Sequence, residues 1–135
     1  MGLLIDSSIF IAAERGHLAL ATHLAGQEQE PMALSAITAS ELLHGIYRVE
    51  EPARRMQRER FVEAILARFP VVEFDLAAAR VHARLWAELA MRGEMVGAHD
   101  LLIAATAIAL DFQVVTANAR DFQRIPGLRI QIWNG

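Results

Sequence analysis

Short apolar segments alternate with longer helical segments along the whole chain, and this alternation restricts the fold more than any other feature. Strands are expected at Leu3–Ile5, Met32–Leu34, Val71–Phe74 and Gln113–Thr116, with a last one near Leu128–Ile132. Helical patterns fill most of the intervals between them. Strands that are separated by helices pair in parallel in α/β domains. The sequence therefore predicts an α/β fold with a central, mainly parallel sheet.

Three helices can be placed from their own signals. Pro52 suits the first turn of a helix whose apolar residues recur every four positions, and Asp75 caps another helix that stops at Gly93. The third helix contains Leu101–Leu110, a stretch without a single charge. Such a helix is expected to pack on most of its sides, against a sheet or a partner subunit.

Composition excludes several classes of chemistry. The 135 residues predict one domain over 1–135, and the absence of cysteine leaves oxygen and imidazole as the only metal ligands. Every basic residue is arginine, so lysine-based phosphate sites and Schiff bases are excluded. No apolar run approaches the roughly 20 residues that cross a bilayer. We therefore expect a cytoplasmic protein with no membrane partner.

Four acids follow predicted strands or begin the helices beside them. Asp6 ends the first strand, Glu41 lies early in the helix after the second, Asp100 opens the uncharged helix, and Asp121 lies beyond the strand ending at Thr116. Ligands of an open α/β sheet bind outside the carboxyl ends of its strands. Because residues at that edge converge despite wide sequence separation, all four acids can face one pocket.

Crowded carboxylates repel one another unless a cation or protons neutralise them. Hard oxygen ligands suit Mg²⁺ or Mn²⁺, and phosphate is the natural substrate of such a site. A bound metal can activate water to attack phosphorus without lysine, cysteine or a covalent intermediate. The acids thus predict metal-dependent cleavage of a phosphodiester.

Each acid also has a structural explanation. Asp6 can be a helix N-cap, Thr38 and Glu41 have the spacing of a capping box, and Asp100 is favourable at a helix N-terminus. Asp121 alone would be an ordinary loop residue. Their joint placement at one edge of the predicted sheet favours the functional interpretation.

Four segments resemble the motifs of PIN-domain proteins, in order and over nearly the whole chain. They are Leu3–Phe10, Ser40–Gly45, Ala98–Ala105 and Thr116–Phe122, and they are most similar to VapC-type toxins of type II toxin–antitoxin modules. The resemblance implies a three-layer fold with a five-stranded parallel sheet, Mg²⁺- or Mn²⁺-dependent cleavage of RNA, and a homodimer. It also implies inhibition by a small antitoxin. The RNA could be tRNA or another structured RNA.

The resemblance further assigns roles to individual residues. It implies three metal-binding acids, Asp6, Glu41 and Asp100. It implies two supporting hydroxyls near the bound water or phosphate, Ser7 and Thr116. Family members place a fourth acid at either of two positions in the last loop. The first position here is Asn118, so we assign the fourth acid to Asp121.

Several other polar and aromatic residues are better explained as surface features. Arginines at positions 48, 54, 55, 58 and 60 could contact RNA phosphates, but glutamates are interleaved with them, which favours a solvated, salt-bridged face. His44 and His99 adjoin two of the acids, where either could tune the site, but we expect them to be structural or surface histidines. Trp86 and Trp133 are too isolated in the sequence to suggest a base-stacking platform.

Two other functions remain alternatives to a metal-dependent ribonuclease. The chain could be a catalytically inactive binding and dimerisation module, as the uncharged helix suggests. It could also be a phosphotransfer domain with Asp6 as the phosphorylated residue. That domain requires a lysine, which this chain lacks.

Overall fold

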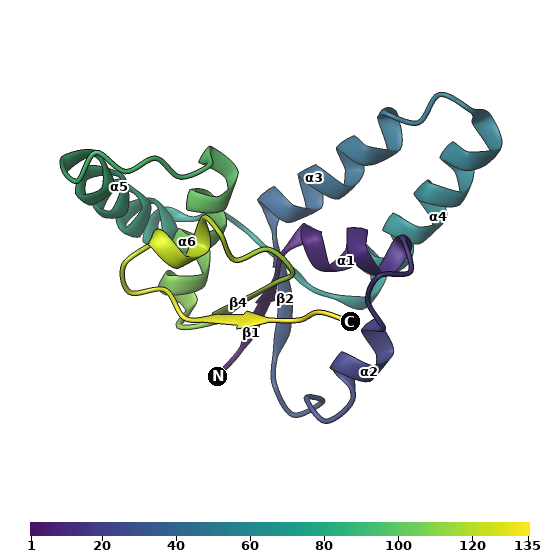
Figure 1. Cartoon of the computed structure of the whole chain (residues 1–135), viewed down its shortest axis with the longest axis horizontal. Coiled ribbons are helices and arrows are strands. Elements are labelled where there is room, and N and C mark those ends of the chain that lie inside the picture. The colour runs from purple at the N-terminus through teal and green to yellow at the C-terminus, as the bar shows by residue number, and fades with distance from the viewer.

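The computed structural model describes residues 1–135 and contains one five-stranded sheet in which every pair of neighbouring strands is parallel (Figure 1). The strand order is β3-β2-β1-β4-β5. The strands are β1 (Leu3–Ile5), β2 (Met32–Ser35), β3 (Val71–Val72), β4 (Gln113–Thr116) and β5 (Ile130–Ile132). The predicted α/β fold with a parallel sheet is confirmed, although β3 is two residues shorter than the expected Val71–Phe74.

Six α-helices connect these strands. They are α1 (Ser7–Glu14), α2 (Leu20–Leu24), α3 (Ala36–Tyr47), α4 (Pro52–Arg68), α5 (Leu76–Met91) and α6 (Ala98–Leu110), and a short 3-10 helix, η1 (Phe122–Arg124), follows β4. The predicted boundary signals hold, because Pro52 begins α4, the Asp75 side chain accepts from the Ala78 amide, and Gly93 follows α5 with a φ of +66°. No helix has the length and apolar character needed to span a membrane.

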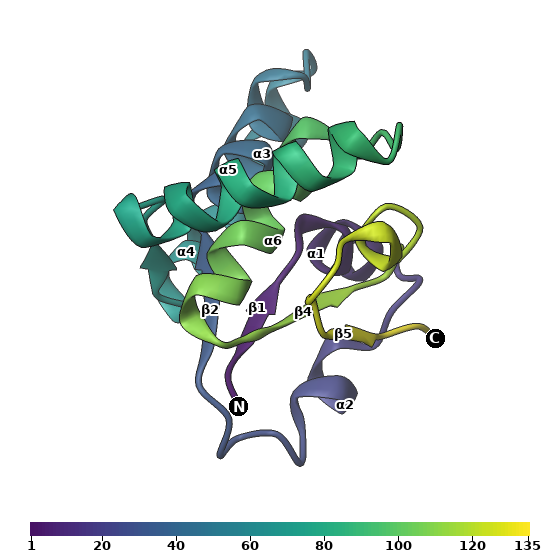
Figure 2. The ribbon, with the colours of Figure 1, turned by 90° about the vertical axis from the view of Figure 1, so that its left-hand side faces the viewer.

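The helices cover both faces of the sheet and form three layers (Figures 1 and 2). Alternate strand residues point to opposite faces. Leu3 and Ile5 accordingly pack with residues of α1–α4, whereas Leu4 packs with residues of α5 and α6. Each face has its own hydrophobic cluster, of 14 and 12 buried residues respectively. Burial on both faces explains why the strands are apolar without alternation.

Helix α6 owes its lack of charge to burial inside this chain. Ile103, Ala104, Ala105 and Ala107 have no exposed surface, and α6 packs against α5 and β4. A partner subunit is therefore not needed to explain the uncharged stretch. This finding weakens the observation that suggested a pure binding module.

The strand order changes direction between β1 and β4. From β1 the chain moves outward through β2 to β3, then returns to place β4 on the other side of β1. Ile5 is in register with Val115, so Asp6 and Thr116 leave the sheet beside each other. Such a switch point opens a crevice at the carboxyl ends of the strands, where α/β proteins bind ligands.

We expect Ile103→Ala to lower the free energy of unfolding by about 2–5 kcal/mol, because it opens a cavity between α6 and its neighbours. Met91→Ala is the matched control, since the Met91 side chain is 89% exposed and its loss should cost less than about 0.5 kcal/mol. Urea denaturation measures both values. Equal losses in the two variants would contradict the packing described for α6.

Candidate active site

Asp6 is a buried acid held at the end of β1. Its amide donates to the Val115 carbonyl at 2.8 Å, and its side chain is only 6% exposed. The carboxylate makes no capping hydrogen bond to α1. Instead, Oδ2 accepts from Ser8 Oγ at 2.7 Å and from Thr116 Oγ1 at 3.0 Å. Asp6 thus occupies the predicted N-cap position of α1, but its carboxylate does not cap the helix.

Glu41 lies in the second turn of α3 and does not form a capping box. The N-cap of α3 is Ser35, whose hydroxyl accepts from the Thr38 amide at 3.0 Å. Helix α3 thus begins before Thr38, and Glu41 is too far along it to reach the free amides. Its carboxylate accepts from Ser7 Oγ at 3.1 Å and lies 3.3 Å from His99 Nδ1.

His99 is more closely linked to the acids than the sequence indicated. Its side chain is 60% exposed, as expected for a surface residue, but its ring contacts Glu41 from the first turn of α6. His44 is exposed and forms no hydrogen bond with an acid. Of the two histidines next to acids in sequence, only His99 contacts one of them.

Asp100 lies where the charges of the other three acids act on it. Burial raises the pKa of Asp100 to about 6, with further increases from the charges of Asp6, Asp121 and Glu41. The charge of His99 acts in the opposite direction. The structure therefore places all four predicted acids within electrostatic range of one point at the start of α6.

Asp121 is fixed beside Asp100 by the backbone of Gly97. The Gly97 amide donates to Asp121 Oδ2 at 3.0 Å. A Cβ atom on Gly97 would lie 3.3 Å from Asp121 Oδ2 and 3.6 Å from Asp100 Oδ2. The two carboxylates thus flank the same glycine, which leaves space for both.

Asn118 faces its own loop rather than the acids. Its Oδ1 accepts from the Arg120 amide at 3.3 Å, and its carbonyl accepts from Thr116 Oγ1 at 3.1 Å. Asp121 shifts the pKa of Asp100, as described above, and Asn118 has no comparable contact. The geometry therefore favours Asp121 over Asn118 as the fourth residue of the cluster.

The donor chemistry of this cluster fits a hard divalent cation. Its ligands would be carboxylate oxygens, with hydroxyls around them, and Mg²⁺ and Mn²⁺ prefer oxygen. No three acidic or histidine side chains are close enough together to form a complete ligand set. Mg²⁺ usually keeps several waters and needs only one or two direct carboxylates, so three converging protein ligands are not a requirement for it.

The arginine-rich helix α4 differs from the predicted salt-bridged face. Arg58 pairs with Glu14 of α1 at 2.6 Å and also donates to the Gly45 carbonyl. Arg55 lies over the Tyr47 ring, and Glu51 caps α4 by accepting from two of its amides. The interleaved glutamates form no ion pairs with these arginines, so the predicted partners were wrong.

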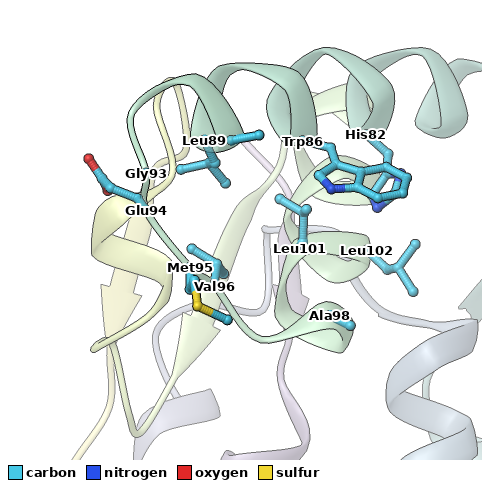
Figure 3. A pocket seen from close by; sticks show the side chains of 11 residues that line it. His82, Trp86, Leu89, Gly93, Glu94, Met95, Val96, Ala98, Leu101 and Leu102 are labelled. Carbon is cyan, nitrogen blue, oxygen red and sulfur yellow. The ribbon is translucent and has the colours of Figure 1, made fainter.

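The largest cavity lies apart from the acids, between α5 and α6 (Figure 3). It has a volume of about 600 Å³, and its lining is mostly apolar. Trp86 lines it together with His82, whose ring centroid is 5.7 Å away, so Trp86 is less isolated than the sequence suggested. Trp133 is buried and stacks on His23, which leaves it no face for a base.

Comparisons with known proteins agree with the fold and with the order of the motifs. The PIN-domain family model matches residues 3–128. The chain belongs to the PIN-domain family. Ribonuclease VapC of Rickettsia bellii is 38% identical over 130 residues, covering 96% of this chain and 95% of that protein. This relative places the chain in the VapC group of the family.

Two further matches come from Salmonella typhimurium. Its tRNA(fMet)-specific endonuclease VapC is 39% identical over 102 residues, which cover 76% of this chain and 75% of that protein. The crystal structure of DNA-bound VapBC from the same organism superposes with a TM-score of 0.86 at 30% identity, covering 98% of each chain. The PIN-like three-layer fold implied by the resemblance is thereby confirmed.

Sequence reasoning missed Ser8 in this PIN domain. Only Ser7 and Thr116 were expected as supporting hydroxyls, yet Ser8 makes the shorter hydrogen bond to Asp6. The signal was present in the sequence, because two consecutive serines follow Asp6 at the start of a helix. Successive helical residues point about 100° apart, so the two hydroxyls reach different partners.

We expect Asp100→Asn to stabilise the protein at neutral pH and to have no effect near pH 4. An unfolded aspartate ionises near pH 4, whereas folded Asp100 has a pKa of about 6. The folded state therefore binds the proton more tightly, and stability falls as the pH rises from about 4 to about 6. After allowance for solvent screening, the gain at pH 7 should be about 1–2 kcal/mol.

Thermal unfolding at pH 4 and pH 7 measures this effect as a rise of a few degrees in Tm at pH 7 only. Asp111→Asn is the control, because the Asp111 side chain is 83% exposed and asparagine suits its left-handed backbone. A gain of equal size at both pH values would show that the charge of Asp100 is not destabilising.

Proposed function

We propose that this protein is a Mg²⁺- or Mn²⁺-dependent endoribonuclease, the toxin of a type II toxin–antitoxin module, that hydrolyses phosphodiester bonds in RNA. The observation that carries the proposal is that three carboxylates, those of Asp6, Asp121 and Glu41, act on Asp100, whose pKa is raised first by burial and then by their charges. A cation would relieve that repulsion and would also attract phosphate. The relatives named as ribonucleases support RNA as the substrate.

In this proposal the acids would bind the ion, and the hydroxyls orient the acids through hydrogen bonds. Asp6, Asp100, Glu41 and Asp121 would bind the cation directly or through water. When bound, the ion would lower the pKa of a water molecule and neutralise charge on the phosphate. Thr116 fixes Asp6, and Ser7 fixes Glu41, through the hydrogen bonds described above. These hydroxyls therefore act as positioning groups.

A structured RNA such as tRNA is the substrate class that we propose. The Salmonella relative is named for one tRNA. The net charge of −3 offers no general attraction to RNA, so binding must depend on local groups and on the metal. The protein would act in the cytoplasm, where such RNA is found.

We also propose that the chain forms a homodimer and binds a small antitoxin. The VapBC assembly of Salmonella supports a protein partner. Two large apolar side chains that line the α5–α6 cavity, Trp86 and Met95, are exposed. Exposed aromatic and methionine side chains are typical of protein interfaces.

The alternative functions receive less support. An inactive binding module would be expected to lose its acids, but all four are present, and the charges of Asp6, Asp121 and Glu41 all act on Asp100. A phosphotransfer domain would require a lysine, and the chain has none. The ribonuclease proposal uses every clustered acid without requiring a missing residue.

We expect Asp6→Asn and Asp100→Asn each to reduce RNA cleavage by more than about a hundredfold, because each removes a charge from the metal site. EDTA should abolish cleavage by the wild type, and Mn²⁺ or Mg²⁺ should restore it. Asp111→Asn makes the same chemical change far from the cluster and should cleave like the wild type. The measurement is the rate of cleavage of total RNA, with mapping of the cut ends. EDTA-sensitive cleavage that persists in folded Asp100→Asn would refute the assignment.

The fourth acid can be tested by comparing two residues of one loop. Asp121→Asn should reduce cleavage by about tenfold or more, because it removes a charge beside Asp100. Asn118→Ala should change the rate by less than threefold, because the Asn118 side chain bonds only within its loop. Cleavage rates at several Mn²⁺ concentrations separate the two variants. The reverse order of effects would assign the fourth position to Asn118.

A further inference from the structure

The Ser8 hydroxyl joins three segments that meet at Asp6. Ser8 lies in the first turn of α1, and its Oγ is 2.7 Å from Asp6 Oδ2 at the end of β1. The same oxygen accepts from the Ala117 amide at 3.0 Å and lies 3.0 Å from Thr116 Oγ1. Ser8 therefore connects the start of α1 with the end of β4, across the switch point.

The hydrogen-bond acceptors available to each hydroxyl proton distinguish the role of Ser8 from that of Thr116. Ser8 has one hydroxyl proton, and its shortest contact is with the Asp6 carboxylate, an acceptor only. The Ala117 amide occupies the acceptor side of Ser8 Oγ. The single proton of Thr116 has three acceptors within 3.0–3.1 Å, namely Asp6 Oδ2, Ser8 Oγ and the Asn118 carbonyl. Ser8 is thus the hydroxyl that donates its proton to Asp6, whereas the Thr116 proton has several competing acceptors.

Both hydroxyls act on the same oxygen of Asp6. Ser8 and Thr116 contact Oδ2, and Oδ1 takes part in no hydrogen bond. The side chain is buried, so its orientation depends on these contacts and on packing. Oδ2 is therefore anchored to the protein, and Oδ1 keeps both of its lone pairs available.

We propose that Ser8 is a positioning residue that anchors Oδ2 of Asp6 and leaves Oδ1 as the oxygen for a divalent cation. This inference rests on the proposed function, because it needs the cation that the acids would bind. Groups that orient a metal ligand typically change metal affinity or activity by 10- to 100-fold when removed. Ser8 does not touch substrate or metal in this proposal and acts only through Asp6.

The test measures Mn²⁺ affinity by calorimetry on the full chain, beside its Tm and the metal dependence of RNA cleavage. Ser8→Ala should weaken Mn²⁺ binding by about 10- to 100-fold. Excess Mn²⁺ should restore most of the cleavage rate, so the apparent KM for metal changes more than kcat. Ser8→Thr keeps a hydroxyl and should recover most of the affinity. Ser40→Ala removes an exposed hydroxyl and should bind like the wild type.

A crystal structure of Ser8→Ala gives a readout that does not depend on metal or activity. We expect the Asp6 carboxylate to change rotamer, or Oδ1 to take over a hydrogen bond. Wild-type Mn²⁺ affinity together with an unchanged Asp6 rotamer would overturn the proposal. If the wild type itself neither binds Mn²⁺ nor cleaves RNA, the proposed function fails. The Asp6 rotamer then decides whether Ser8 anchors that side chain.

Discussion

The pairing of β1 with β4 is the contact on which the rest of the site depends. The register that joins Ile5 to Val115 also brings the Asp6 amide to the Val115 carbonyl and sets Thr116 beside the Asp6 carboxylate. A shift of one residue would turn every side chain of β1 to the opposite face of the sheet. Such a shift would also move Asp6 away from the Val115 carbonyl and the Thr116 hydroxyl. The register of β1 with β4 thus fixes the position of an acid that contributes nothing to the core.

The acid cluster carries an electrostatic cost that the core must offset. Burial and three neighbouring charges raise the pKa of Asp100, which means that ionised Asp100 destabilises the folded protein at neutral pH. Asp100 lies in the first turn of α6, where the helix dipole offsets part of that cost. The next residues of α6 are buried between α5 and the sheet. Helix α6 therefore carries the unfavourable charge of Asp100, and the apolar packing of its next residues holds that carboxylate in place.

Sequence reasoning succeeded where a local pattern has one structural outcome. Apolar segments between helices fix a parallel sheet, and the carboxyl end of β1 fixes Asp6 at its edge. It was less successful where the same residue spacing occurs in two different local structures. Thr38 and Glu41 fit a capping box, and only the earlier start of α3 at Ala36 excludes that interpretation. Contacts between distant side chains, such as Arg58 with Glu14, leave no periodic signal, so the partners of the α4 arginines were wrong.

The two serines after Asp6 show how one helical turn can serve two acids. Ser7 and Ser8 are consecutive, and helical geometry turns their side chains about 100° apart. They therefore cannot both contact the same carboxylate, and in this structure Ser7 bonds Glu41 whereas Ser8 bonds Asp6. A single residue separates helix α1 from β1, so the first turn of α1 lies next to the end of that strand. A turn with two hydroxyls thus ties Asp6 and Glu41 to the same helix, and in the proposed metal site it would set the positions from which the two acids approach the cation.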